Sequence, residues 1–261
     1  MDDYDHIELE RTDGVARLAL SRPGEHNALH GEMIDELAAA TTRLVEDRAV
    51  RALVLTGSGD AFCTGADLSV LSGGPEDARK LRRLAVRLHA TVRTLAAAPI
   101  PVVTGVNGVA AGGGLGLALV GDLVLVHPEA RFEFVYPRIG LSGDGGSTYF
   151  LPRLVGLRRA MEIALLDEPI SPERAVADGL ATEVVDGDFD RRLAAVAADL
   201  ADGPTKAYAA TKRLLHRSFA RELGVQLAAE TDSIARLART DDYAAGYEAF
   251  FGDDEPTFRG E

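Results

Sequence analysis

Cysteine and long apolar segments are both scarce in this sequence, and each scarcity excludes a class of protein. The chain of 261 residues has one cysteine, Cys63, which excludes an intramolecular disulfide framework and fits a reducing cytoplasm. No apolar run reaches the length of about 18 residues that a membrane-spanning helix needs. The acidic, polar segment 1–14 resembles neither a secretory signal nor a transit peptide. We therefore expect a cytoplasmic protein without a membrane partner.

The charge balance is strongly acidic. Aspartate and glutamate outnumber lysine and arginine by 41 to 28, and the formal net charge is −13. A surface of this kind repels phosphate backbones, so we expect no nucleic-acid partner. Hydrophobic residues make up 46% of the chain, which is enough for a substantial core.

Strands alternate with helices along the first part of the chain, and helices dominate after about Pro172. In the first part we expect a hairpin that turns at Thr12-Asp13-Gly14, a helix over 31–47, a strand over 51–56 and a long amphipathic helix that ends before Pro99. In the second part we expect helices that begin at Ser171-Pro172, after Gly203-Pro204 and near 222. This order predicts stacked βαβ units followed by a helical region. We place an α/β core at 1–200 and a C-terminal helical region at 201–261.

Two glycine-rich segments, 60–68 and 108–119, each lie between an expected strand and an expected helix. Backbone N–H groups at a helix N-terminus are unpaired, and two of them pointing at one spot would form an oxyanion hole. Glycine at Gly112 and Gly113 would let a substrate carbonyl approach the backbone. The alternative is that such a turn only packs a helix against a strand. The second segment lacks the G-x-G-x-x-G spacing of a dinucleotide site.

Five motifs occur in the order and spacing found in one enzyme superfamily. They are "RPGEHNAL" (22–29), "LVLTGSGDAFCTGADL" (53–68), "PVVTGVNGVAAGGGLGLALVGDLVL" (101–125), "GLSGDGGSTYFLPRLVG" (140–156) and "SPERAVADGLATEVV" (171–185). Together they resemble the crotonase, or enoyl-CoA hydratase/isomerase, superfamily over nearly the whole chain. The resemblance implies an α/β fold built as a spiral of ββα repeats with a C-terminal helical trimerisation region. It also implies an acyl-CoA thioester as substrate, no additional cofactor, and a homotrimer or a dimer of trimers.

The same resemblance assigns roles to individual residues. It implies that the backbone N–H groups of Thr64 and Gly113 form the oxyanion hole. It further implies a site for substrate and coenzyme A that includes Ala28, Ala66, Asp67, Leu68, Gly112 and Tyr136. For Asp67 an N-cap of the following helix is an equal alternative. Tyr136 either orients a substrate or fills space.

The two glutamates with which hydratases of this family split water are absent. Gly116 stands at one of the matching positions and Tyr136 at the other. Without a paired acid and base, addition of water has no evident route. Asp144 remains, in the segment "GLSGDGGS", where dienoyl-CoA isomerases, a chlorobenzoyl-CoA dehalogenase and the ring-1,2-epoxyphenylacetyl-CoA isomerases of the family carry an aspartate. The closest resemblance is to the last group.

We therefore expect an acyl-CoA isomerase that shifts a double bond, or opens a ring epoxide, with Asp144 as acid and base. Two alternatives stay open. Asp144 is a nucleophile or base in thioester hydrolysis, dehalogenation or hydration, or it is a turn residue in a family member that binds acyl-CoA without turnover.

The remaining histidines, the cysteine and the acidic C-terminal stretch point to no additional site. The six histidines show no metal-ligand spacing, so no metal site is expected; His89 is interpreted as a surface or packing residue, and Cys63 as a buried filler. The acidic stretch 252–255 stands where relatives often carry basic residues, which would weaken binding of the coenzyme A phosphates. We expect the acyl pocket to be built from the 69–90 region and the C-terminal helices.

Overall fold

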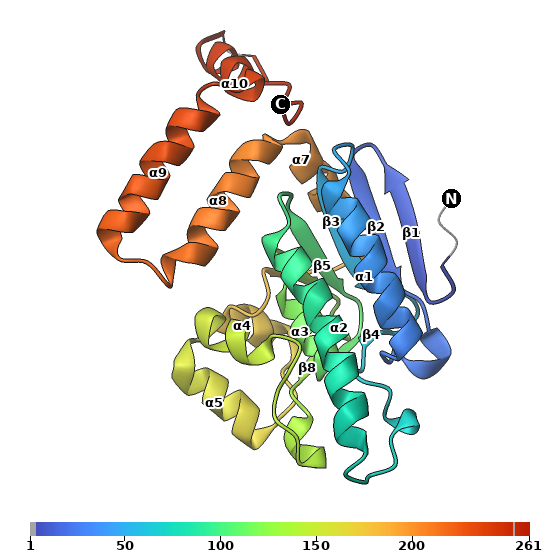
Figure 1. Ribbon diagram of the computed structural model, residues 1–261. Helices are drawn as coiled ribbons and strands as arrows, with labels where there is room; N and C mark the ends of the chain where they lie inside the picture. The colour runs from blue at the N-terminus through green and yellow to red at the C-terminus, as the bar shows by residue number, and fades with distance from the viewer. Residues whose placement is uncertain (1–3, 253) are drawn as a thin grey trace.

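A computed structural model describes residues 4–252 and 254–261 of the chain (Figure 1). The fold begins with a hairpin of β1 (Ile7–Thr12) and β2 (Val15–Leu20), which pair antiparallel. Its turn is the predicted one, with positive φ at Asp13 and Gly14, a conformation that aspartate and glycine tolerate best.

Parallel strands then alternate between two sheets. In the described residues the larger sheet has the order β1-β2-β3-β5-β7-β9 and the smaller one the order β4-β6-β8. The strand bounds are β3 (Ala52–Gly57), β4 (Ala61–Cys63), β5 (Val102–Val106), β6 (Val109–Ala111), β7 (Leu123–Val126), β8 (Arg131–Glu133) and β9 (Glu183–Val184). The consecutive pairs β3/β4, β5/β6 and β7/β8 each give one strand to each sheet. This repeat confirms the predicted α/β spiral.

Helices cover both faces of the larger sheet. On one side α1 (Gly31–Glu46) and α2 (Asp77–Ala97) pack against each other, and on the other α7 (Phe189–Asp202) packs on β3 and β5. Alternate residues of β3 therefore enter different cores, because successive side chains of a strand point to opposite faces: Leu53 lies in the main core and Val54 in the smaller core under α7.

Short helices surround the smaller sheet. α3 (Gly113–Leu119) is completely buried and follows β6, while α4 (Ser147–Leu154), α5 (Gly156–Leu166) and α6 (Pro172–Asp178) follow β8. The predicted start of α6 is confirmed, since the Ser171 hydroxyl accepts a hydrogen bond from the Arg174 N–H as an N-cap.

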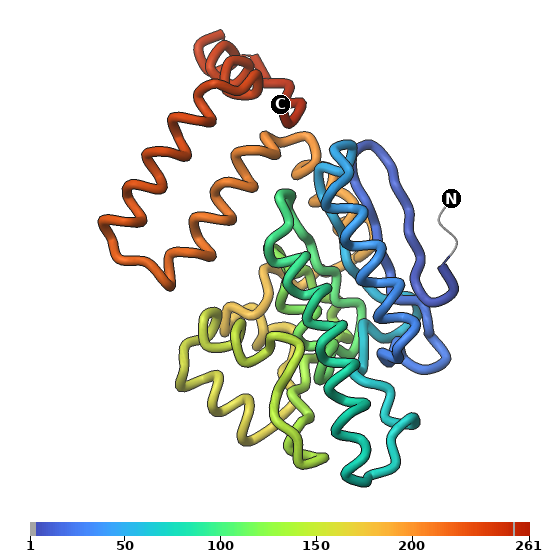
Figure 2. Tube along the Cα trace, in the orientation of Figure 1, coloured from blue at the N-terminus to red at the C-terminus, as the bar shows by residue number. Residues whose placement is uncertain are grey.

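The last helices extend away from the core as a separate arm (Figure 2). They are α8 (Thr205–Ser218), α9 (Leu223–Leu237) and α10 (Asp241–Gly252). The sequence predicted α8 and α9 but not α10. The proposed division at 200/201 falls inside α7, and both this division and the trimer stay predictions. Asp253, in the acidic stretch discussed above, lies outside the described residues.

The C-terminal tail returns to the core through Arg51. The guanidinium of Arg51 donates to the carbonyl oxygens of Gly203 (2.6 Å) and Phe258 (3.0 Å) and to the hydroxyl of Thr205 (3.1 Å). These contacts fix where the arm begins relative to the larger sheet. Among the described residues no helix is both long and apolar enough to cross a membrane.

Candidate active site

A cavity of about 270 Å³ opens between α2, the N-terminus of α3 and the segment that precedes α4. Seven of the nine site residues expected from the sequence line it: Thr64, Ala66, Leu68, Gly112, Gly113, Tyr136 and Asp144. α2 contributes Leu81, Leu84, Ala85 and Leu88 to its apolar wall, in agreement with the prediction that the 69–90 region helps to build the pocket. The other two expected residues, Ala28 and Asp67, lie outside this lining.

Gly113 is the first residue of α3, so its N–H has no intrahelical partner and carries the positive end of the helix dipole. The preceding residue, Gly112, has φ of 53°, a conformation that turns the chain from β6 into α3. A Cβ on Gly65 would lie 2.8 Å from the carbonyl oxygen of Ala111 and 3.2 Å from the Gly113 nitrogen. Glycine at these positions lets the two predicted donor segments approach each other.

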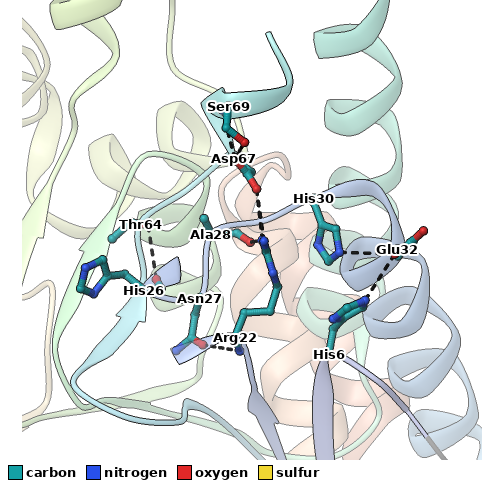
Figure 3. Close-up of polar contacts among 10 residues, drawn as sticks. All are labelled: His6, Arg22, His26, Asn27, Ala28, His30, Glu32, Thr64, Asp67 and Ser69. Atoms are coloured by element: carbon teal, nitrogen blue, oxygen red, sulfur yellow. Dashed lines mark hydrogen bonds and ion pairs between the residues drawn. The ribbon is translucent and has the colours of Figure 1, made fainter. Parts of the chain in front are cut away.

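The second predicted donor already has a partner. The N–H of Thr64 donates to the carbonyl oxygen of His26 at 3.3 Å, and the Thr64 hydroxyl donates to the same oxygen (Figure 3). A distance of 3.3 Å is long for an N–H···O bond. An incoming carbonyl oxygen must therefore share or replace the His26 acceptor before both N–H groups can bind it.

Asp144 is half-buried at the edge of the cavity, next to the first donor. Its Oδ1 lies 4.0 Å from the place that a Cβ on Gly113 would take. The phenol of Tyr136, which is 7% exposed, donates a short hydrogen bond to this Oδ1. Burial, together with the neighbouring Asp144 charge, raises the pKa of Tyr136 above its ordinary value, so the phenol stays protonated and acts as a donor. Oδ2 is then the oxygen left for a substrate.

This geometry gives Tyr136 a role in positioning the carboxylate. We expect Tyr136→Phe to lower the turnover of an acyl-CoA substrate by roughly 10–100-fold, since a hydrogen bond to a charged group is worth about 1.5–3 kcal/mol. The ring, packed edge-on against Phe134 with centroids 4.9 Å apart, stays in place, so the melting temperature should change little. Steady-state kinetics and thermal unfolding measure both. Unchanged turnover would show that Tyr136 only fills space.

The loop that carries Asp144 is held by His89, which the sequence analysis interpreted as a surface or packing residue. The N–H of Gly145 donates to Nε2 of His89, on α2, at 3.1 Å. The Asp144 carbonyl oxygen accepts from both the N–H (3.0 Å) and the hydroxyl (2.8 Å) of buried Ser147. Helical periodicity puts His89 beside buried Leu88, but nothing local in the sequence shows that α2 faces the Asp144 loop.

Gly116, where family hydratases carry a glutamate, has no room for any side chain. A Cβ there would lie 2.1 Å from the carbonyl oxygen of Gly145, far inside contact distance. The Asp144 loop thus fills the space that a side chain at Gly116 would need. The replacement of glutamate by glycine and the presence of the Asp144 loop are parts of one local packing arrangement.

Arg22 joins the two segments that give Leu29, Ala66 and Leu68 to the cavity lining, a part of the lining here called the mouth (Figure 3). Its guanidinium donates to the carbonyl oxygen of Ala28 (2.6 Å) and pairs with the Asp67 carboxylate (3.3 Å). Asp67 also accepts from the hydroxyl and N–H of Ser69, which lower the pKa of this carboxyl and make it the N-cap of η2 (Leu68–Val70). Ala28 and Asp67 therefore hold the mouth together rather than line the cavity. The sequence analysis did not single out Arg22.

A second cavity, of about 630 Å³, lies on the other side of the Asp144 loop, between α2, α4 and α8. His89 and Gly146 border it, and so do Arg93, Arg213 and Arg217. The C-terminal helices, which the sequence analysis expected in the acyl pocket, contribute no described lining residue to the first cavity; α8 lines this second one instead.

The matches to known proteins agree with this architecture. The family model described as enoyl-CoA hydratase/isomerase matches residues 10–261. The chain belongs to the enoyl-CoA hydratase/isomerase family. It is 40% identical over 258 residues to the protein named "Probable enoyl-CoA hydratase" of Rhodobacter capsulatus, covering 98% of this chain and 99% of the relative. It is 37% identical to the 1,2-epoxyphenylacetyl-CoA isomerase of Escherichia coli, covering 95% of each chain.

Solved structures of this family share the fold closely. An enoyl-CoA hydratase from Polaromonas superposes with a TM-score of 0.91 at 30% sequence identity, covering 97% of this chain and 99% of that one. The names of these relatives include both hydratases and an isomerase. Membership of the family is therefore established, while the choice between these two reactions rests on the residues in the cavity.

Proposed function

We propose that this enzyme is an acyl-CoA isomerase in which a single carboxylate, Asp144, moves a proton along the acyl chain. The observation that carries the proposal is that the Asp144 carboxylate and Gly113 line one cavity close to each other, and that this cavity has no other carboxylate among its described lining residues. Addition of water would need a second acid or base, and the Gly116 position has no room for one.

The proposed reaction begins at the thioester. The N–H groups of Gly113 and Thr64 donate to the carbonyl oxygen and stabilise the negative charge that develops on it. Asp144 Oδ2 takes a proton from the α carbon, and the electrons of that C–H bond form the enolate. The protonated Asp144 then returns the proton to the γ carbon, the enolate collapses, and the double bond moves to the α,β position. No atom is gained or lost.

The tyrosine and the apolar wall support this sequence of steps. Tyr136 keeps Asp144 Oδ1 occupied, so that the other carboxylate oxygen carries the proton in both directions. The side chains of Leu29, Leu84 and Leu88 exclude water from the enolate. For an aryl substrate the same enolate stabilisation and proton transfer would serve the opening of a ring epoxide.

Deuterium labelling tests the proposal on the wild-type enzyme. A 3-enoyl-CoA deuterated at the α carbon should give the 2-enoyl-CoA with part of the label transferred to the γ carbon, because one carboxylate carries the proton both ways. Mass spectrometry and NMR locate the label. A product heavier by one water would identify a hydratase and overturn the proposal, and binding without turnover or exchange would identify a non-catalytic binder.

The same geometry leaves one second candidate, because the Asp144 oxygen that Tyr136 does not bind can also attack a carbon of the substrate. In this alternative Asp144 attacks an acyl or aryl carbon and displaces the coenzyme A thiolate or a halide. Water then hydrolyses the resulting anhydride or ester and restores Asp144. Rapid-quench mass spectrometry would then detect an acylated or arylated Asp144 during turnover. Its absence at all times, with label transfer present, would exclude the nucleophilic route.

A further inference from the structure

Outside the active site, three side chains that are far apart in the sequence meet where β1 begins and α1 starts. They are His6, just before β1, and His30 and Glu32, at the N-cap and in the first turn of α1 (Figure 3). The sequence predicted no metal ligands, because the spacing of these residues follows no known pattern. The fold brings one donor atom from each of the three to within 4.8 Å of the others.

The distances between these atoms suit a shared cation. Nε2 of His6 and Nε2 of His30 lie 3.4 and 3.6 Å from the same carboxylate oxygen of Glu32. Such distances are too long for N–H···O hydrogen bonds. Two ligands of a tetrahedral zinc ion, each bonded at about 2.0–2.2 Å, lie roughly 3.3–3.5 Å apart. The two imidazoles also meet edge to face, with centroids 4.4 Å apart and planes at 81°.

The backbone on both sides of the cluster is fixed. The N–H of His6 donates to the Glu36 carboxylate at 2.9 Å, one helical turn beyond Glu32, and the His6 carbonyl oxygen accepts from the N–H of Ser21 at 2.8 Å. His30 begins α1, where its carbonyl oxygen accepts from the N–H of Ile34 at 3.1 Å. Two of the three donors therefore project from rigid elements, as a preorganised metal site requires.

The imidazole of His30 lacks hydrogen-bond partners within the described chain. Its Nδ1 is buried without a partner, and its Nε2 faces only Glu32 at 3.6 Å. Both ring nitrogens of His30 are therefore without a hydrogen-bond partner, and the one that faces Glu32 is available to bind an ion.

We propose that His6, His30 and Glu32 form a binding site for a divalent transition-metal ion, with Zn²⁺ as the best fit. Two imidazoles and one carboxylate are a donor set that zinc uses with water as the fourth ligand. Mg²⁺ and Ca²⁺ prefer oxygen donors throughout and are therefore disfavoured. Glu32, whose side chain is 81% exposed, leaves the site open to solvent for entry of the ion.

The bound ion would join β1 to α1. His30 lies two residues after Ala28, whose carbonyl oxygen Arg22 holds at the mouth of the active-site cavity. An ion that binds only the folded chain stabilises it by mass action. The site therefore predicts that Zn²⁺ raises the melting temperature through these three residues.

The test uses the tag-free full-length chain, freed of metal with a chelator. Titration with Co²⁺ should give the intense visible bands of a tetrahedral complex at one ion per chain, and Zn²⁺ should displace it. His6→Gln, His30→Gln and Glu32→Gln should each weaken binding by about 100-fold or more. Glu36→Gln, which acts through the backbone N–H groups of Asp5 and His6, should weaken it by about 10-fold. The rise in melting temperature with Zn²⁺ should disappear in the three ligand variants.

His26→Gln is the matched control. Nδ1 of His26 lies 3.6 Å from the Asp60 carboxylate, a histidine–carboxylate pair without a third donor. This variant should bind Co²⁺ and Zn²⁺ like the wild type. Equal binding by the wild type and a His6→Gln/His30→Gln double variant, with circular dichroism showing both folded, would overturn the proposal. A Co²⁺ spectrum that is the same in the wild type and in this double variant, which would place the ion on other ligands, would also overturn it.

Discussion

Asp144→Asn should slow both α-proton exchange and double-bond migration by about 10²–10⁴-fold, the usual contribution of a general acid–base group. Asparagine has the shape of aspartate, and its side-chain oxygen can still accept the hydrogen bond from Tyr136. The variant therefore keeps the geometry of the loop and loses only the group that takes the proton. Mass spectrometry of deuterium uptake from D₂O, beside chromatography of the isomeric products, measures both rates.

A second aspartate provides the control for this result. Asp186 is exposed and, like Asp144, directly precedes a glycine in a loop, so Asp186→Asn should exchange and isomerise at the wild-type rate. Calorimetric titration with a non-reactive acyl-CoA should give similar affinities for Asp144→Asn and the wild type. Exchange at the full rate in Asp144→Asn would remove this residue from the mechanism and leave it as a turn residue.

Much of the fold followed from local patterns in the sequence. The hairpin at Asp13-Gly14, the start of α6 at Ser171 and the end of α2 before Pro99 all depend on residues within a few positions, and all are confirmed. α10 was not predicted because only residues 238–240 separate it from α9, which is a brief break in a long helical pattern. Local signals define elements well and the junctions between helices poorly.

The candidate site could likewise be predicted only where local motifs define it. Thr64, Gly113 and Asp144 were expected from motifs, and the structure brings them to one cavity. Contacts across long sequence distances could not be predicted, because they depend on how α2 and the loop after β2 pack. His89 under Gly145 and Arg22 between Ala28 and Asp67 are such contacts.

The hydrogen bond from the Thr64 N–H to the His26 carbonyl oxygen also could not be predicted from the motifs. His26 and Asn27 both have positive φ, and the buried Asn27 amide holds this conformation by donating to the carbonyl oxygens of Ser58 (2.9 Å) and Ala61 (2.7 Å). A motif search assigns a donor by position. Whether the donor N–H is free depends on this distant network.

Gly116→Glu restores a carboxylate where family hydratases carry one, yet we expect it to add no water to an enoyl-CoA. The new Cβ would lie 2.1 Å from the Gly145 carbonyl oxygen, and a backbone carbonyl cannot turn away without moving the loop. Overpacking of this kind costs roughly 1–3 kcal/mol of unfolding free energy, sometimes more. Because Gly145 adjoins Asp144, isomerase turnover should fall together with stability. Urea unfolding and product analysis measure the two effects.

Two alanine variants separate the steric effect of a Cβ at position 116 from the effect of the added carboxylate. Gly116→Ala introduces only the Cβ, so it should lose stability and turnover much as Gly116→Glu does, although alanine in a helix is otherwise favoured over glycine by about 1 kcal/mol. Gly24→Ala places a Cβ where no atom lies within 4 Å, and its stability should stay within about 0.5 kcal/mol of the wild type. A Gly116→Glu enzyme that is stable and forms 3-hydroxyacyl-CoA would show that the Asp144 loop can move to make room for the new side chain. Hydratase chemistry in this chain would then depend only on the missing carboxylate, and the packing of Gly116 against Gly145 would not determine which reaction the enzyme performs.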